Sequence, residues 1–127
     1  MKKIVSGAAA VIAAAGSLLA VTAAPANAAG YNYGAIALSS STGSIGYSYD
    51  YASRAAAQDA ALSECRGMDC KIVARFANGC GAVAYSRQGY YTFGAAESRS
   101  AARNQALDRN LSDATIIHWN CTSGYRL

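Results

Sequence analysis

Four cysteines carry the most distinctive chemistry in this 127-residue sequence. They are Cys65, Cys70, Cys80 and Cys121, with four, nine and forty residues between successive members. Redox thiols favour C-x-x-C spacing, and zinc sites favour close pairs of Cys and His, so neither pattern is present. An even number of cysteines in a short exported chain is typical of a disulfide framework. We therefore expect two structural disulfides and no metal site.

His118 is the single histidine and the candidate general base near neutral pH. On the strand expected at residues 115–119, Ile116 and His118 share one face, whereas Ile117 and Trp119 share the other. The seven carboxylates lie mostly at the faces or ends of expected helices, where solvation and the helix dipole account for them. No phosphate-binding glycine motif occurs. The sequence therefore predicts no catalytic residue and no cofactor, with a hydrolase that uses His118 and an acid or hydroxyl as an alternative.

Tyrosine is the residue type most suggestive of binding, with nine copies in the chain. Its flat ring and hydroxyl can stack on a sugar or fill a pocket of a partner protein. Ile45, Tyr47, Tyr49 and Tyr51 recur at every second residue and are expected on one face of a strand. The candidate binding residues are Tyr47, Tyr49, Tyr51, Tyr90 and Tyr91. In the alternative interpretation, these rings cover the helices and complete the core.

The first 28 residues have the pattern of a signal peptide. Lys2 and Lys3 precede an Ala-rich apolar stretch, and Ala26-Asn27-Ala28 provides a small-x-small cleavage site. We expect residues 1–28 to be removed and residues 29–127 to form a single secreted domain. A retained membrane anchor is the alternative, but the stretch is only weakly apolar, and the rest of the sequence has no apolar run of spanning length.

The charge balance disfavours nucleic acid as a partner. The formal charge of +4 falls to +2 when Lys2 and Lys3 leave with the leader, and the arginines are dispersed rather than clustered. Nucleic-acid binding surfaces concentrate basic residues on one face. We expect a monomer whose partner is a protein or an envelope component.

The chain contains an internal duplication with a period of about 45 residues, and repeats of this kind define the folding unit. Two pairs of segments show it most clearly: Gly34-Ala35-Ile36-Ala37-Leu38 with Gly81-Ala82-Val83-Ala84-Tyr85, and Ser53-Arg54-Ala55-Ala56-Ala57 with Ser98-Arg99-Ser100-Ala101-Ala102. We therefore divide the domain into two repeats, at about residues 31–79 and 80–121.

Each repeat has the pattern strand-strand-helix-strand. Alternating apolar residues predict the strands, and Ser53 and Ser98 are suited to cap the two helices. The buried helical stripes are mostly Ala, as at Ala57 and Ala61, which lets a helix lie close to a sheet. The expected fold is α+β, a tandem duplication with about six antiparallel strands and two helices, cross-linked by disulfides.

The repeat also suggests how the cysteines pair, which spacing alone leaves open. Cys80 and Cys121 are expected at equivalent ends of equivalent strands, so we expect them to pair, which leaves Cys65 to pair with Cys70. In the loop-entropy model the longer link restricts the unfolded chain by roughly 4 kcal/mol and the shorter by roughly 2 kcal/mol. The second repeat has Asn110 in place of Cys65, so the shorter link is expected in one half only.

Several motifs resemble the family called domain of unknown function 4189. They are Tyr33-Gly34-Ala35-Ile36-Ala37, the Thr42-Gly43 turn, Ser53-Arg54 with the following Ala-rich helix and Cys65, and Asn78-Gly79-Cys80-Gly81-Ala82. The resemblance covers essentially all of the expected mature chain. It implies a small exported bacterial protein with disulfides, and it carries over no catalytic residues and no substrate.

The sequence thus predicts a secreted, non-enzymatic interaction module. A small rigid scaffold rich in Tyr and Arg, without a convincing catalytic set, favours an effector-like protein that engages an envelope component or a foreign protein. The alternatives are a small extracytoplasmic hydrolase acting on cell-wall material and a glycan-binding module.

Overall fold

The computed structural model describes residues 31–125. In these residues it has two three-stranded antiparallel sheets, with strand orders β3-β2-β4 and β6-β5-β7. The elements are β2 (Tyr33–Leu38), β3 (Ile45–Tyr51), α3 (Arg54–Glu64), β4 (Lys71–Ala77), β5 (Cys80–Tyr85), β6 (Tyr91–Ala96), α4 (Arg99–Asp108) and β7 (Thr115–Cys121). The predicted α+β class with two strand-strand-helix-strand units is confirmed. We call β2 to β4 the first unit and β5 to β7 the second.

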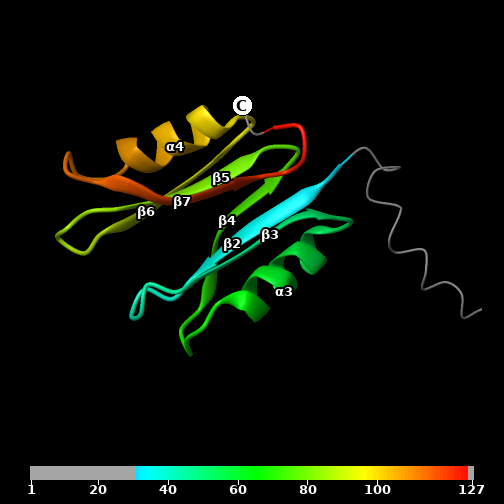
Figure 1. The fold of residues 1–127 in the computed structure, drawn as a ribbon, viewed down its shortest axis with the longest axis horizontal. Coiled ribbons are helices and arrows are strands. Elements are labelled where there is room, and N and C mark those ends of the chain that lie inside the picture. Colours follow the sequence, from blue (N-terminus) through cyan, green and yellow to red (C-terminus); the bar gives the residue numbers. More distant parts are fainter. Residues whose placement is uncertain (1–30, 126–127) are drawn as a thin grey trace, which may run out of the picture.

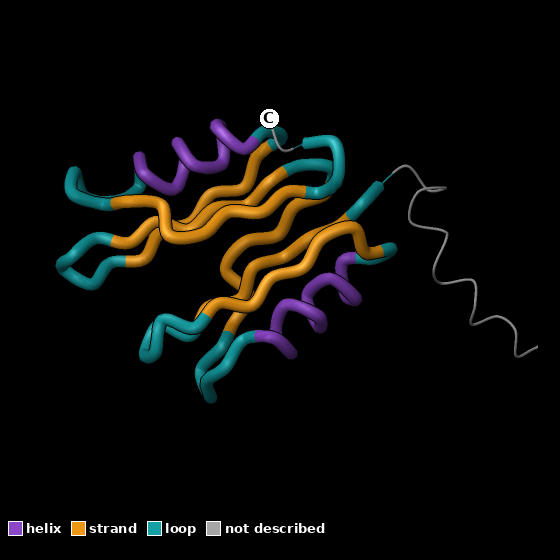
Figure 2. Tube along the Cα trace, in the orientation of Figure 1, coloured by secondary structure: helices purple, strands orange, loops and turns teal. Residues whose placement is uncertain are grey.

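The elements are arranged in four layers, helix, sheet, sheet and helix (Figures 1 and 2). α3 covers the outer face of the first sheet, and α4 covers the outer face of the second. The inner faces of the two sheets pack on each other around Ile36, Ala74, Phe76 and Val83. Each sheet is therefore covered on both faces, and its central strand, β2 or β5, is almost wholly buried.

Small residues allow each helix to lie directly on its sheet, as the Ala-rich stripes predict. Ala57 and Ala61 of α3 are buried, as are Ala102 and Ala106 of α4. On the strands, Gly46 and Gly94 leave no room for a side chain, because an added Cβ would lie 2.1 Å from a helical carbonyl oxygen in each case. A short helix-to-sheet distance is thus built into both units.

The helix starts follow the prediction. Ser53 is the N-cap of α3 and accepts a hydrogen bond from the amide of Ala56 at 3.1 Å. Ser98 does the same for α4 with the amide of Ala101, again at 3.1 Å. These bonds satisfy amide groups that the first helical turn leaves without partners.

The two units correspond position by position. Ile36 pairs with Tyr47 and Ala74, and Val83 pairs with Phe93 and His118. Between the sheets, β2 contacts β5, β4 contacts β6 and β3 contacts β7. The duplication makes β4 equivalent to β7 and β6 equivalent to β3, so the β4–β6 contact in one direction corresponds to the β3–β7 contact in the other. The molecule therefore has approximate two-fold symmetry about the packed central strands.

A bulge in β7 overturns the predicted faces of that strand. Val83 pairs with His118 and Ala84 pairs with Ile116, so Ile117 is an extra residue without a counterpart on β5. Such an extra residue interrupts the regular alternation, so side chains two positions apart across it no longer lie on the same face of the strand. Ile116 and Trp119 consequently both pack against the α4 core, whereas His118 faces the first sheet. The expectation that Ile116 and His118 share a face was wrong.

A second bulge lies in β3, and it makes the predicted row of tyrosines on that strand wrong. Ala35 pairs with Ser48 but Tyr33 pairs with Tyr51, so β3 has one extra residue between those pairs. Asp50, in this segment, adopts a left-handed φ of 62°. Tyr51 therefore shares a face with Tyr33, on the α3 side, and does not continue the row of Tyr47 and Tyr49.

Disulfides join Cys65 to Cys70 and Cys80 to Cys121. The pairing is the expected one, but the reason given for the longer link was wrong. Cys80 begins β5 and Cys121 ends β7, and they are direct cross-strand neighbours within the second unit. They do not occupy equivalent ends of equivalent strands.

The predicted signal peptide, residues 1–28, lies outside the described residues. Within residues 31–125, no helix has the length and apolar character needed to cross a bilayer.

Candidate functional site

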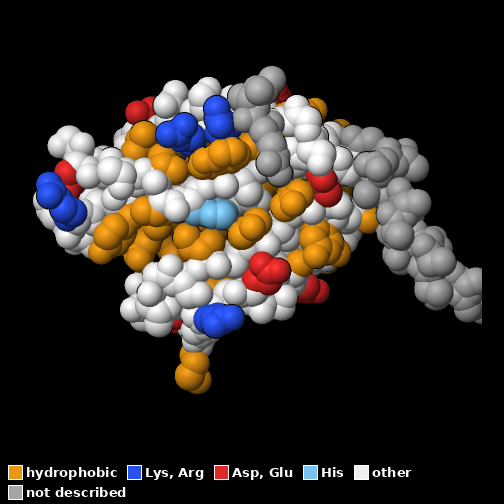
Figure 3. All heavy atoms as spheres, viewed as in Figure 1, with side chains coloured by type: hydrophobic (Ala, Val, Ile, Leu, Met, Phe, Trp, Pro, Cys, Tyr) orange, Lys and Arg blue, Asp and Glu red, His pale blue; other side chains and the backbone are white. Residues whose placement is uncertain are grey.

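The edge where β3 meets β7 gathers aromatic side chains from both units. Figure 3 shows the histidine in the middle of a band of hydrophobic side chains that crosses this face. An open hollow of about 190 Å³ lies along it. We call this surface the aromatic seam, and its lining residues are Tyr47, Tyr49, His118, Trp119, Asn120 and Cys121.

Tyr47 and Tyr49 face away from α3. The residues between and before them, Ser48 and Gly46, are the ones that touch the helix, and the Ser48 hydroxyl donates to the carbonyl of Ala57 at 2.6 Å. Tyr47 is 41% exposed and Tyr49 is 39% exposed. Their rings are nearly parallel, with centroids 6.5 Å apart. These two tyrosines therefore do not cover the helix, in contrast to the alternative interpretation of the sequence.

His118 is part of the seam and half-buried. Its ring centroid lies 4.8 Å from that of Tyr47, and its Nε2 is 3.1 Å from the Oδ1 of Asn120. Because an amide oxygen only accepts, Nε2 carries the proton and donates. Burial lowers the pKa of His118 below its ordinary value of 6.5, and the bond to Asn120 opposes this only in part. The side-chain hydrogen-bond partner of His118 is thus the amide of Asn120.

Two side chains, Asn120 and Asp50, form hydrogen bonds that join the two units along the seam. Asn120 donates from Nδ2 to the carbonyl of Ser48 at 3.0 Å, so one side chain contacts both His118 and β3. Asp50, at the bulge of β3, accepts from the amide of Ser123 at 2.9 Å and also from its hydroxyl. The relative position of Tyr47 and His118 is therefore fixed by hydrogen bonds as well as by packing.

On the α4 side of the seam, Trp119 packs against Arg99. The guanidinium carbon of Arg99 is 4.9 Å from the centre of the Trp119 ring, a cation–π arrangement. One face of the indole is therefore already covered. Trp119, Asn120 and Arg99 were not among the residues predicted to bind, because a bulge and a helix from elsewhere in the chain bring them together.

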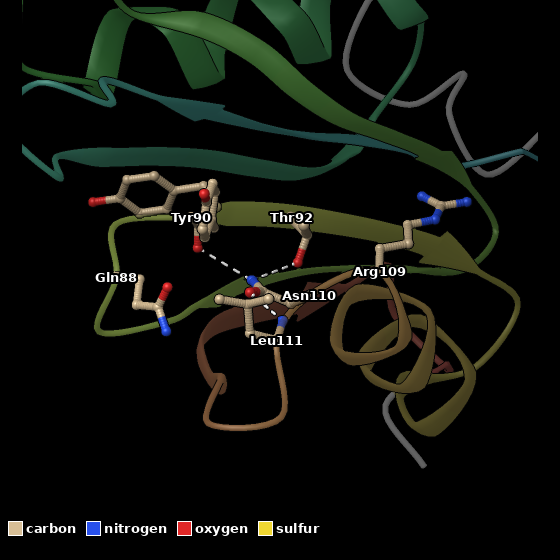
Figure 4. A pocket seen from close by; sticks show the side chains of 7 residues that line it. Gln88, Tyr90, Thr92, Arg109, Asn110 and Leu111 are labelled. Atoms are coloured by element: carbon tan, nitrogen blue, oxygen red, sulfur yellow. Dashed lines mark hydrogen bonds between the residues drawn. The ribbon is translucent and has the colours of Figure 1, made fainter.

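Tyr90 and Tyr91 belong to a different surface (Figure 4). They line a hollow of about 310 Å³ at the β5–β6 hairpin and the end of α4, whose full lining is Gln88, Tyr90, Tyr91, Thr92, Arg109, Asn110 and Leu111. Asn110 lies at its centre and donates to the Tyr90 carbonyl at 3.1 Å and to the Thr92 hydroxyl at 2.8 Å. The structure thus brings Tyr47 and Tyr49 together and places the hairpin tyrosines on a separate hollow.

Asp69 has a structural environment. It accepts hydrogen bonds from the Ser39 hydroxyl and, at 3.2 Å, from the amide of Ser41. The Ser39 bond is the main reason that the pKa of Asp69 is lowered. These contacts join the loop that contains Cys70 to the β2–β3 turn. Nowhere in residues 31–125 do three or more His, Cys, Asp or Glu side chains gather in a way that could hold a metal ion.

Two proteins of Mycobacterium tuberculosis are similar in sequence to this chain. The chain is 39% identical over 90 residues to the uncharacterized protein Rv1813c of Mycobacterium tuberculosis, covering 71% of this chain and 60% of that protein. It is 42% identical over 89 residues to the protein Rv1269c of the same organism, covering 70% of this chain and 68% of that one. The chain therefore spans about 60% of the length of the first of these relatives.

A solved structure supports the fold. The NMR structure of Rv1813c superposes with a TM-score of 0.61 at 37% sequence identity, covering 71% of this chain and 74% of that one. The model of the family described as domain of unknown function 4189 matches residues 33–121, from the first residue of β2 to the last of β7. With the family's model spanning both units, this chain is a member of the domain of unknown function 4189 family.

Proposed function

We propose that the chain is a secreted, non-enzymatic interaction module that binds a partner protein through the aromatic seam. The observation that carries the proposal is the position of Tyr47 and Tyr49 on the sheet face turned away from α3, with about two fifths of each side chain exposed. Exposed tyrosines on a rigid strand supply contact area at low entropic cost.

The scaffold suits such a role. Two disulfides and two closely packed helices fix the strands that display the seam. Disulfides persist in oxidising compartments, which supports export of the domain. The neighbours of His118 are an aromatic ring and an amide, which suits a recognition surface better than proton transfer.

The test is retention of the purified, disulfide-bonded domain on immobilised envelope proteins, with Tyr49→Ala as the probe and Tyr90→Ala as the control from the other hollow. We expect Tyr49→Ala to reduce retention at least fivefold without lowering the melting temperature, and Tyr90→Ala to leave it unchanged. Equal retention of both variants would contradict the proposal.

A glycan ligand is the second candidate, because nearly parallel rings such as those of Tyr47 and Tyr49 can stack on a sugar. The same variants distinguish the two. Retention on purified cell-wall polysaccharide that is lost in Tyr49→Ala, without binding to envelope proteins, would assign the seam to a glycan.

A further inference from the structure

The outer edge of β6 is closed by side chains from α4 and from Arg109, the residue that caps the C-terminal end of that helix. Arg109 donates from Nη1 to the carbonyl of Phe93 at 2.7 Å, and the Oε1 of Gln105 accepts from the amide of Ala95 at 3.1 Å. β6 is an edge strand, and these two backbone groups belong to alternate residues. A further strand would pair with such groups, so α4 occupies the place of an added strand.

The corresponding edge in the first unit is that of β3. Both hairpins begin with the same kind of bond, Ser39 amide to Ser44 carbonyl and Ser86 amide to Tyr90 carbonyl. In an antiparallel ladder, hydrogen-bonded pairs alternate with pairs whose backbone groups point away from the partner strand. When the pairs are counted from these two bonds, the backbone groups of Ile45 and Tyr47 point outward, as those of Phe93 do. Tyr47 is therefore the counterpart of Phe93.

The residues that close the edge in the second unit have no equivalent in the first. Gln105 is the seventh residue after the helix cap Ser98, and Arg109 is the eleventh. The seventh and eleventh residues after Ser53 are Ala60 and Glu64. The methyl group of Ala60 cannot accept a hydrogen bond from a strand amide as Gln105 does, and the carboxylate of Glu64 cannot donate one to a strand carbonyl as Arg109 does.

A hollow lies at the unclosed edge. It has a volume of about 450 Å³ and is lined by Tyr47, Ser48, Tyr49, Tyr51 and Glu64. The lining wraps around β3, with Tyr47 on the inner face and Glu64 from the end of α3. The first unit thus has an open cavity and a negative charge where the second has a guanidinium bonded to the strand.

We propose that the outer edge of β3, from Ile45 to Ser48, takes up an extended peptide segment of a partner protein as an added antiparallel or parallel strand, with a Lys or Arg of that segment against Glu64. Main-chain hydrogen bonds would give affinity, and Tyr47 would contact alternate side chains of the peptide. The bulge at Asp50 ends the straight edge. This inference specifies the partner class of the proposed interaction function and rests on it.

Charge disfavours a two-fold pair formed by the β3 strands of two copies of the chain. A two-fold β3–β3 pair would bring two Glu64 carboxylates to one edge, where like charges repel. Pairing of β3 with β6 of another copy is obstructed by Arg109 and Gln105. A partner strand that supplies its own cation meets neither obstacle.

The experiment uses fluorescein-labelled nine-residue peptides of alternating Val and Thr with a central Lys, and measures fluorescence anisotropy. The double variant A60Q/E64R installs the closing residues of the second unit. Asp59→Arg, on another face of the same helix, is the control for charge. We expect saturable binding that A60Q/E64R weakens at least tenfold and Asp59→Arg changes less than twofold, with circular dichroism showing each variant folded.

Two altered peptides sharpen the test. Methylation of alternate backbone nitrogens should abolish binding, because it removes strand hydrogen bonds, and a central Glu should weaken it at least fivefold. Undiminished binding to A60Q/E64R, insensitivity to methylation, or no binding by the Lys peptide would overturn the proposal. So would concentration-dependent dimerisation that A60Q/E64R abolishes, since it would assign the edge to a second copy.

Failure here is separable from failure of the proposed function. If the Lys peptide does not bind while Tyr49→Ala still loses retention on envelope proteins, the edge proposal fails and the aromatic seam stands. If the peptide binds but Tyr49→Ala and A60Q/E64R both leave that retention intact, the seam does not carry the interaction.

Discussion

The first and second units share one fold but secure it differently. In both, a capped helix lies on a strand glycine, and an edge strand carries a bulge opposite the central strand. The first unit fixes the end of α3 with Cys65–Cys70, whereas the second fixes the end of α4 with the hydrogen bonds of Asn110. The second unit then cross-links β5 to β7 through Cys80–Cys121.

This difference separates what the fold requires from what it tolerates. The close helix-to-sheet distance occurs in both units and depends on residues without bulky side chains. The link between helix end and sheet varies, since a disulfide and an amide network serve at matching positions. Cys80 and Cys121 match Tyr33 and Ala77 of the first unit, which hold their strands without a covalent bond.

The largest expected effect concerns the two disulfides, which close loops of unequal length. The double variant C80A/C121A opens a link that spans 41 positions, and C65A/C70A opens one that spans 5. The loop-entropy model predicts losses of roughly 4 and roughly 2 kcal/mol of unfolding free energy. Urea unfolding of the two variants measures this, and equal losses would show that native-state packing outweighs loop length.

The next effect tests the feature that the units share. Gly46→Ala and Gly94→Ala each place a methyl group against a helical backbone, and we expect each to cost about 3 kcal/mol through displacement of the helix. Thermal unfolding of both variants provides the comparison. A large loss for one glycine and none for the other would break the equivalence of the units.

Asn110→Ala tests whether the amide network replaces the short disulfide. Its removal leaves the carbonyl of Tyr90 and the hydroxyl of Thr92 without this donor, at a cost of about 2 kcal/mol, similar to that of C65A/C70A. Urea unfolding measures the loss. A loss below about 0.5 kcal/mol would mean that the second unit needs no link at this position.

The smallest effect concerns His118, which corresponds to Ala74 in the first unit. Burial lowers its pKa in the folded state, so below pH 6.5 the unfolded chain binds the proton first. The stability linked to the neutral form of His118 is therefore fully present above the ordinary pKa of the group. It declines as the pH falls from there toward the pKa of the folded state. Urea midpoints at pH 7.5 and 5 should show a smaller decline in His118→Ala than in the parent, and an identical decline would contradict this assignment.

Residues with local roles were predictable from the sequence. Ser53 and Ser98 cap helices because a side-chain oxygen reaches amides two or three positions ahead, which needs no information from elsewhere in the chain. The Ala stripes show 3.6-residue periodicity and identify the buried helical faces. The duplication reduced the fold to one unit, which the structure repeats.

The candidate site was only partly predictable. Tyr47 and Tyr49 were recognised by their alternation, but Tyr51 was assigned to the same face because periodicity contains no sign of the bulge at Asp50. His118 and Trp119 were placed on the wrong partners for the same reason, since Ile117 is an ordinary strand residue in the sequence.

The sequence by itself therefore determined the elements, their duplication and the chemical types available for binding. The tertiary structure alone decided which faces meet: that His118 packs on Tyr47, that Asn120 joins the two sheets, and that Glu64 lies where Arg109 closes the opposite edge. The physical reason is that helix caps and periodicity depend on neighbours in the chain. Strand register and bulges depend on cross-strand hydrogen bonds, and sheet stacking depends on packing, both between residues far apart in the sequence.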